Sequence, residues 1–219
     1  MISLIETQDG SHSILSERFG VTYHSKYGAI QESQHVFLGA GLNLVLPKRD
    51  NIRIFEMGFG TGLNAYLSLL SAQKAQKQIY YEAVEAFPIE VEEAQRLNYA
   101  QQLGEDSAQL EALHQAKWGE EIAIAPHFHL LKWQQSLEEA TLRGGYDVVY
   151  YDAFGPRTQP ELWERAPFQR LYDAMNADSV LVTYCAKGVF KRNLKDIGFK
   201  VEGLPGPPGK REMTRAFKV

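Results

Sequence analysis

The sequence contains a single cysteine, Cys185, and no long apolar run. One cysteine excludes an internal disulfide and any metal site built from several thiolates, and it is typical of a reducing compartment. No stretch approaches the roughly 18 apolar residues of a membrane helix, and the N-terminus lacks the features of a signal peptide. Histidines and acids show no metal-ligand spacing. We therefore expect a cytoplasmic protein with no metal and no membrane contact.

What the chain does contain is an ordinary globular composition. Its 219 residues are 44% hydrophobic and 23% charged, which suffices for a buried core without cross-links. The net charge is −4, yet residues 187–219 hold nine basic and three acidic residues. Such a segment can bind a phosphate backbone even on an acidic protein. A solvated helix face followed by an edge strand would give the same pattern.

The N-terminal quarter is predicted to form a cap. Asp9-Gly10 lies between two short runs and predicts a β-hairpin over residues 2–16. Residues 32–46 have helical spacing that ends at Pro47. We expect residues 1–48 to form an extension and residues 49–219 to form one compact domain, which we treat as a monomer.

Beyond residue 50, strands are predicted to alternate with helices, which indicates a parallel sheet covered on both faces. The predicted strands are 53–57, 79–86, 128–132, 146–152, 179–184, 199–203 and 213–219. The predicted helices are 63–75, 88–101, 105–117, 136–142, 161–175 and 189–197. No helix separates the last two strands, so they predict an antiparallel edge.

A glycine loop follows the first strand of this α/β pattern and precedes a helix. Gly58, Gly60 and Gly62 would let the backbone turn sharply beside a ligand, and the helix would present its N-terminal amides. The spacing G-x-G-x-G, with Glu56 ahead of it, differs from the dinucleotide fingerprint and lacks the P-loop lysine. The loop therefore predicts a different nucleoside cofactor, and a purely structural turn is the alternative.

Two acids stand where predicted strands end. Glu85 closes the second strand, where a carboxylate can accept hydrogen bonds from both hydroxyls of a ribose. Asp152 closes the fourth strand and could orient a substrate amine, while Phe154 could stack on a flat base. The alternatives are a surface acid at Glu85 and a turn cap at Asp152.

Four segments occur in an order that resembles one enzyme family. They are residues 56–64, 84–88, 152–163 and 209–213, and the opening segment 23–37 is also similar. Together they resemble the tRNA 5-(aminomethyl)uridine-34 methyltransferases, MnmD, whose domain also forms the transferase half of the bifunctional MnmC enzymes. The resemblance implies an α/β, Rossmann-like class I methyltransferase fold, with a mostly parallel seven-stranded sheet and an antiparallel edge.

The same resemblance implies an activity. A methyl group would pass from S-adenosyl-L-methionine to the primary amine of 5-aminomethyl(2-thio)uridine at wobble position 34, and the tRNA anticodon loop would be the partner. No flavin-dependent oxidase domain is present in this sequence, so the resemblance implies a stand-alone transferase that uses an amine made by another enzyme.

The residues and the resemblance together assign roles to individual positions. Asp152 and Phe154 are the predicted catalytic residues. The predicted cofactor contacts are Glu56, Gly58, Gly60, Thr61, Gly62, Asn64, Glu85, Ala86, Trp133 and Asp152. The predicted substrate contacts are Tyr23, Lys187, Lys191, Arg192, Lys210 and Arg211.

The adenine contact, the chemical role of Asp152 and the roles of two histidines need further detail. Where the family usually has an acid that reads adenine, this sequence has Lys132-Trp133-Gln134, so Trp133 or Gln134 would take that contact. Because an unperturbed Asp has a pKa of about 3.9, we expect Asp152 to orient the amine while water takes the proton, unless burial raises that pKa. His24 and His35 could be catalytic, but a structural role is the favoured interpretation.

Two other functions fit the pattern. One is an enzyme of the same fold that acts on a small amine by methyl or aminopropyl transfer. The other is an inactive cofactor-binding module that holds tRNA. The basic C-terminal segment favours the tRNA enzyme over the small-amine enzyme. Intact glycines in the loop, together with Glu85 and Asp152, argue against an inactive module.

Overall fold

The computed structural model describes residues 3–219, so the predicted start of the hairpin at residue 2 lies outside the described range. An eight-stranded sheet runs in the order β10-β11-β9-β8-β4-β5-β7-β6. Its strands are β4 (Asn51–Met57), β5 (Gln78–Val84), β6 (Glu121–Ala125), β7 (Phe128–Trp133), β8 (Tyr146–Tyr151), β9 (Met175–Thr183), β10 (Lys200–Pro205) and β11 (Glu212–Lys218).

The strands from β9 to β7 are parallel, and antiparallel pairs flank them at both edges. The predicted mostly parallel sheet with an antiparallel edge is confirmed. The sheet has eight strands rather than seven because β6, which was not predicted, adds to β7. β6 is only five residues long, has no fully buried side chain and lies at the edge of the sheet, so its short run of small and branched apolar residues did not mark it as a core strand.

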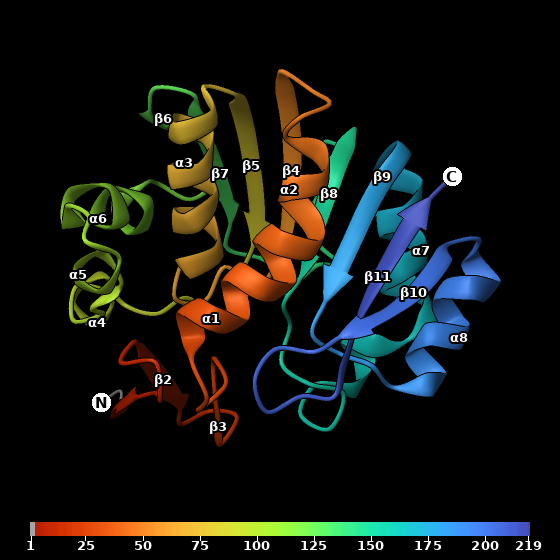
Figure 1. Ribbon diagram of the computed structural model, residues 1–219, viewed down its shortest axis with the longest axis horizontal. Helices are drawn as coiled ribbons and strands as arrows, with labels where there is room; N and C mark the ends of the chain where they lie inside the picture. The colour runs from red at the N-terminus through yellow and green to blue at the C-terminus, as the bar shows by residue number, and fades with distance from the viewer. Residues whose placement is uncertain (1–2) are drawn as a thin grey trace.

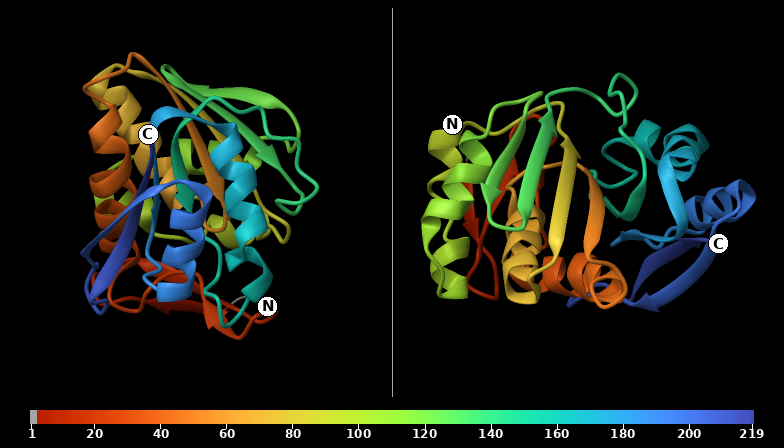
Figure 2. Two further views of the ribbon diagram at one scale, coloured as in Figure 1. Left: turned by 90° about the vertical axis from the view of Figure 1, so that its right-hand side faces the viewer. Right: turned by 90° about the horizontal axis from the view of Figure 1, so that it is seen from above.

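Helices cover both faces of the sheet (Figures 1 and 2). They are α3 (Leu63–Ala75), α4 (Val91–Ala94), α5 (Tyr99–Leu103), α6 (Ser107–Gln115), the 3-10 turn η2 (Pro160–Trp163), α7 (Arg165–Ala174) and α8 (Gly188–Ile197). One apolar core lies under α3, and a second joins the other face to α7 and α8.

Three predicted helices differ from the structure. Residues 161–175 form most of the 3-10 turn η2 and the helix α7, with Glu164 in an extended conformation between them. Residues 88–101 contain α4 and the first part of α5, and a turn at residues 95–96 followed by two irregular residues separates the two helices. The predicted helix 136–142 is wrong. Ser136 and Glu139 close a single turn there, and Gly144 and Gly145 with positive φ follow it, so the segment connects β7 to β8 without a helix.

The N-terminal segment begins with three short antiparallel strands, β1 (Ser3–Glu6), β2 (His12–Ser16) and β3 (Val21–Thr22). They lie near the carboxyl ends of the parallel strands (Figure 1). Asn98 ties the hairpin to the rest of the chain, because its side chain donates to the Gly10 carbonyl and accepts from the His12 N–H.

A continuous helical run follows, made of α1 (Ala29–Ser33), a π-helical stretch η1 (Gln34–Leu42) and α2 (Asn43–Val45). It begins before the predicted helix 32–46 and lies beside α3 (Figure 1). A Cβ on Gly41 would lie 3.0 Å from the Val182 side chain. The missing side chain therefore allows this run to approach the sheet closely, which fixes Glu32 above the strand ends.

Candidate active site

A cavity of about 350 Å³ opens at the carboxyl ends of β4, β5 and β8. Its size falls within the range of small-molecule sites. The glycine loop, the segments after β5 and β8 and the N-terminal cap form its walls. Ten of the predicted site residues line it: Tyr23, Gly58, Gly60, Thr61, Asn64, Glu85, Ala86, Asp152, Phe154 and Lys210.

Backbone conformation and close packing both require glycine at two positions of the glycine loop. Gly58 and Gly60 have φ of 90° and 48°, in the left-handed region that side chains disfavour. A Cβ on Gly58 would lie 3.0 Å from the backbone oxygen of Asp152, and one on Gly60 would lie 3.0 Å from the ring of Tyr23. The loop therefore packs closely against both the segment after β8 and the cap.

Glu85 follows β5 and braces the glycine loop. One carboxylate oxygen accepts the Gly60 N–H at 3.0 Å, and the other accepts the Phe87 N–H at 2.9 Å. Burial raises the pKa of Glu85, and these backbone N–H groups oppose that shift. Because a carboxylate oxygen can accept more than one hydrogen bond, Glu85 can hold the loop and still accept from ligand hydroxyls.

Asn64 joins two acids on neighbouring strands. Its amide nitrogen donates to Glu56 Oε1 and to Asp152 Oδ2, both at 2.9 Å. Glu56 is buried beneath the cavity rather than lining it, and burial raises its pKa well above the usual range. Its hydrogen bond to the cavity wall is made to Asn64, which α3 carries in its first turn.

Asp152 lies directly after β8 and lines the cavity. Enclosure by the protein raises the pKa of this carboxyl group well above its ordinary value. The negative charge of Glu32 adds to the rise, while the Asn64 hydrogen bond and the Lys210 charge oppose it. A carboxyl group in this state is suited to exchanging a proton with a bound amine.

Thr61 and His24 fasten the cap to the glycine loop. The Nε2 atom of His24 lies 2.7 Å from Thr61 Oγ1. Burial lowers the pKa of His24 to about 4, so the ring is neutral at physiological pH. His35 bonds the Pro205 carbonyl at 2.8 Å. Both rings bond protein groups, as the structural interpretation expects.

Three partly exposed aromatic rings, Phe19, Tyr23 and Phe154, line one part of the cavity and form an aromatic rim. The ring of Phe154 lies 4.8 Å from that of Phe19 and 5.1 Å from that of Tyr23. Trp163 is buried, and its indole donates to the Phe154 carbonyl at 2.7 Å, which positions the segment that carries Phe154. Phe19 was not predicted, since no motif marks it, and only the cap's fold brings it here.

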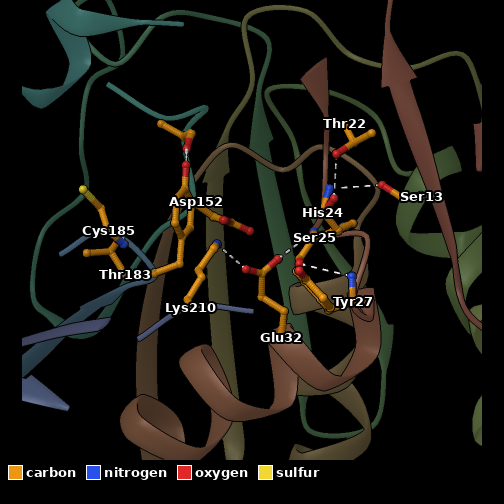
Figure 3. Close-up of polar contacts among 12 residues, drawn as sticks. Ser13, Thr22, His24, Ser25, Tyr27, Glu32, Asp152, Thr183, Cys185 and Lys210 are labelled. Carbon is orange, nitrogen blue, oxygen red and sulfur yellow. Dashed lines mark hydrogen bonds and ion pairs between the residues drawn. The ribbon is translucent and has the colours of Figure 1, made fainter. Parts of the chain in front are cut away.

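Glu32 is the charged side chain that the sequence analysis missed as a site residue. It lies on α1, is 7% exposed and forms an ion pair with Lys210 at 2.5 Å. Figure 3 shows Lys210 reaching toward Glu32, with Asp152 beside them. Lys210 was predicted to contact tRNA phosphate, but its ammonium group contacts a carboxylate in the cavity wall instead.

Several predicted residues lie away from the cavity. The indole of Trp133 donates to Glu82 at 2.9 Å and packs against the core under α7 and α8. Its neighbour Gln134 lines a second cavity of about 180 Å³, which adjoins the first at Phe59 and Gly60. Gly62 caps α3.

The remaining basic residues lie on the surface near α8 and β11. Lys191 pairs with Glu212 at 2.8 Å, while Lys187, Arg192 and Arg211 are exposed. Within residues 3–219 no three His, Cys, Asp or Glu side chains gather as a metal site would require, and no helix there is long and apolar enough to cross a membrane.

The chain is similar to known proteins over nearly its whole length. Residues 127–219 match a family described as S-adenosyl-L-methionine-dependent methyltransferase. A protein of Cupriavidus metallidurans, the tRNA 5-methylaminomethyl-2-thiouridine biosynthesis bifunctional protein MnmC, is 31% identical over 92% of this chain. The protein of the same name from Azoarcus sp. is 31% identical over 97% of it. The chain spans about a third of the length of these relatives, 32% and 35%.

Solved structures show the same fold. MnmC2 from Aquifex aeolicus superimposes with a TM-score of 0.82, covering 100% of this chain and 70% of that one at 22% identity. Spermidine synthase from Thermotoga maritima gives a TM-score of 0.56 at 12% identity, covering 100% of this chain and 71% of that one. The fold, the sequence relatives and the matched family together support an S-adenosyl-L-methionine-dependent methyltransferase domain that is similar to the one in the MnmC proteins.

Proposed function

We propose that the protein transfers a methyl group from S-adenosyl-L-methionine to the primary amine of 5-aminomethyl(2-thio)uridine at position 34 of tRNA. The observation that carries the proposal is the Asn64–Asp152 hydrogen bond of 2.9 Å. It joins a nucleoside-binding half of the cavity, made by the glycine loop and Glu85, to an acidic half suited to an amine. The names of the relatives support the tRNA substrate.

The residues present fit S-adenosyl-L-methionine. The side-chain-free edge of Gly58 and Gly60 leaves room for a ligand beside the loop, and Glu85 can accept from the ribose hydroxyls. Ala86 continues that wall, and Gln134 in the adjoining cavity offers an amide for adenine. When bound, this cofactor supplies an electrophilic methyl group on a sulfonium.

Asp152 is proposed to take the proton that the substrate amine must lose. An alkylammonium has no free electron pair and is the main form near pH 7, as for Lys, with a pKa of about 10.4. The raised pKa of Asp152 reduces the difference between its own pKa and that of the alkylammonium group, which favours proton transfer from the ammonium to the carboxylate. Asp152 therefore acts as a base as well as an orienting acceptor, and holding the amine in place lowers the barrier further.

The rim and the basic surface are proposed to bind the anticodon loop. An unstacked base can stack on the rings of Phe154 and Tyr23. The side chains of Lys187, Arg192 and Arg211 are exposed and can contact phosphate groups of the RNA. Lys191 could leave its ion pair with Glu212 and bind a phosphate instead. The proposal places the protein with its substrate in the cytoplasm, where it acts on an amine that an earlier modification step has attached to the tRNA.

The test uses purified protein, S-adenosyl-L-methionine and tRNA that carries 5-aminomethyluridine, with nucleoside mass spectrometry as the readout. We expect the wobble uridine to gain one CH₂, and the Asp152→Asn variant to lose turnover while it still binds cofactor. Unmodified tRNA and tRNA with the carboxymethylated amine should not react. Methylation of putrescine or spermidine in place of tRNA would contradict the proposal and favour the small-amine enzyme.

A further inference from the structure

The ammonium group of Lys210 occupies a site built from groups that recognise cations. Its Nζ lies 2.5 Å from Glu32 Oε1 and 3.7 Å from the centre of the Tyr184 ring. Glu32 is 7% exposed, and its second oxygen accepts the Ser25 N–H at 3.0 Å. The Tyr184 hydroxyl donates to the Ala153 carbonyl, which fixes the ring. Figure 3 shows Glu32 and Lys210 facing each other beside Asp152.

A carboxylate next to an aromatic face is a receptor for an alkylammonium ion. The end of a lysine side chain, CH₂–NH₃⁺, is the same chemical group as a protonated aminomethyl substituent. We propose that Glu32 and Tyr184 form the receptor for the substrate's alkylammonium group, and that Lys210 occupies this receptor until the substrate displaces it. The inference rests on the proposed function and names the residues that select the amine.

The surroundings of Lys210 make it exchangeable. It lies on the turn between β10 and β11, and its side chain is 31% exposed. Lys132 provides the contrast, since it is 1% exposed and donates to two backbone carbonyls, those of Leu113 and His114. Lys132 is a fixed part of the core, whereas the Lys210 side chain can withdraw from the cavity into solvent.

Glu32 requires a cation in either state. A carboxylate that is buried without a partner is strongly destabilising. In the free protein Lys210 supplies the positive charge, and in the complex the substrate would supply it. The exchange also gives specificity, because a neutral hydroxymethyl or an anionic carboxymethyl group cannot replace the charge that Lys210 withdraws.

The decisive experiment uses the full chain without tRNA or cofactor. Lys210→Ala removes the internal ammonium and leaves Glu32 uncompensated. We expect propylammonium chloride to raise the Tm of this variant above its value in sodium chloride of equal concentration. It should raise the wild-type Tm much less, because Lys210 competes. In Lys210→Ala/Glu32→Gln, which lacks the carboxylate of the proposed receptor, the apparent affinity should fall about tenfold or more.

A matched ion pair provides the control. Lys77 contacts Asp50 at the same 2.5 Å, but Asp50 is 86% exposed. Propylammonium should therefore stabilise Lys77→Ala no more than it stabilises the wild type. Equal stabilisation of the wild type and Lys210→Ala, or of Lys210→Ala and the double variant, would overturn the proposal.

Kinetics on tRNA that carries 5-aminomethyluridine give a second readout. Displacement predicts a lower KM for Lys210→Met and a higher KM for Glu32→Gln, because the first variant frees the receptor and the second removes its charge. A Lys210 that anchored phosphate would instead give Lys210→Met a higher KM, and that result would also overturn the proposal. The Tm experiment needs no tRNA, so its outcome stands even if tRNA is not the substrate.

Discussion

Asn64 donates a hydrogen bond to Asp152 across the cavity floor, at 2.9 Å. The donor is carried by the helix that follows the glycine loop, and the acceptor follows the neighbouring strand β8. The bond therefore links the part of the site assigned to the cofactor with the part assigned to the amine. A change in one half will be transmitted to the other.

The first prediction concerns this bond. Asn64→Ala leaves Asp152 and Glu56 without their shared donor, and we expect turnover to fall about tenfold, as a loss of 1.4 kcal/mol would produce. Unfolding in urea should show a stability loss of about 1–3 kcal/mol. Asn176 is the matched control, because its amide likewise donates twice, to Gly145 and Asp147, away from the cavity. Asn176→Ala should lose stability but retain kcat, and equal kcat losses in both variants would contradict the assigned role.

The second prediction is the pH dependence of the rate. Because burial and Glu32 raise the pKa of Asp152, its carboxyl group stays protonated well above pH 4 and cannot accept a proton there. We expect kcat to rise with pH through this raised value. Asp152→Asn should abolish both the turnover and this limb of the profile. A profile in which the rate stays flat down to pH 4 would contradict a basic role.

The raised pKa of Asp152 also affects stability, and here the effect of rising pH is a loss rather than the gain expected for kcat. Between the unfolded pKa of about 3.9 and the raised folded value, the folded protein holds a proton that the unfolded chain has lost. Asp152 therefore lowers the free energy of unfolding as pH rises through this window. At pH values above the folded pKa of Asp152, the Asp152→Asn variant should be more stable than the wild type. Below pH 4 the two proteins should have the same free energy of unfolding, apart from effects that do not depend on pH. Tm measured across pH for both proteins checks this.

The fourth prediction separates backbone conformation from site geometry. Gly58 and Gly104 both have left-handed φ, 90° and 71°. Alanine at either position should cost about 1–2 kcal/mol of stability. A Cβ on Gly58 would also lie 3.0 Å from the Asp152 backbone oxygen, whereas on Gly104 it would meet nothing within 4 Å. In a calorimetric titration, only Gly58→Ala should bind the cofactor more weakly than the wild type. Equal affinity in the two variants would show that the glycine loop does not contact the cofactor.

The fifth prediction distinguishes Trp133 from Gln134. Trp133→Phe removes the indole donor to buried Glu82, so it should lower stability but leave cofactor affinity within about twofold. Gln134→Ala should weaken cofactor binding with little effect on stability, since Gln134 is exposed and lines the second cavity. The opposite pattern in a calorimetric titration would restore Trp133 as the adenine contact.

The sequence by itself determined the parts of the protein that local patterns encode. Apolar strands alternating with helices specified the parallel sheet, because a strand buried on both faces needs a continuous apolar run. Gly58, Gly60, Glu85 and Asp152 were predictable because each follows a strand, and parallel strands bring their carboxyl ends to one edge. The order of these motifs was enough to indicate the family.

The tertiary structure decided what depends on contacts between distant residues. Glu32 and Lys210 are 178 positions apart, and no periodicity or motif links them, so only the packing of α1 and the β10–β11 turn over the strand ends pairs them. The raised pKa of Asp152 likewise arises from enclosure and from the charge of Glu32. Trp133 lies away from the cavity because alternation along β7 turns its side chain to the other core. Burial and charge at the site thus follow from chain packing, which a linear pattern does not contain.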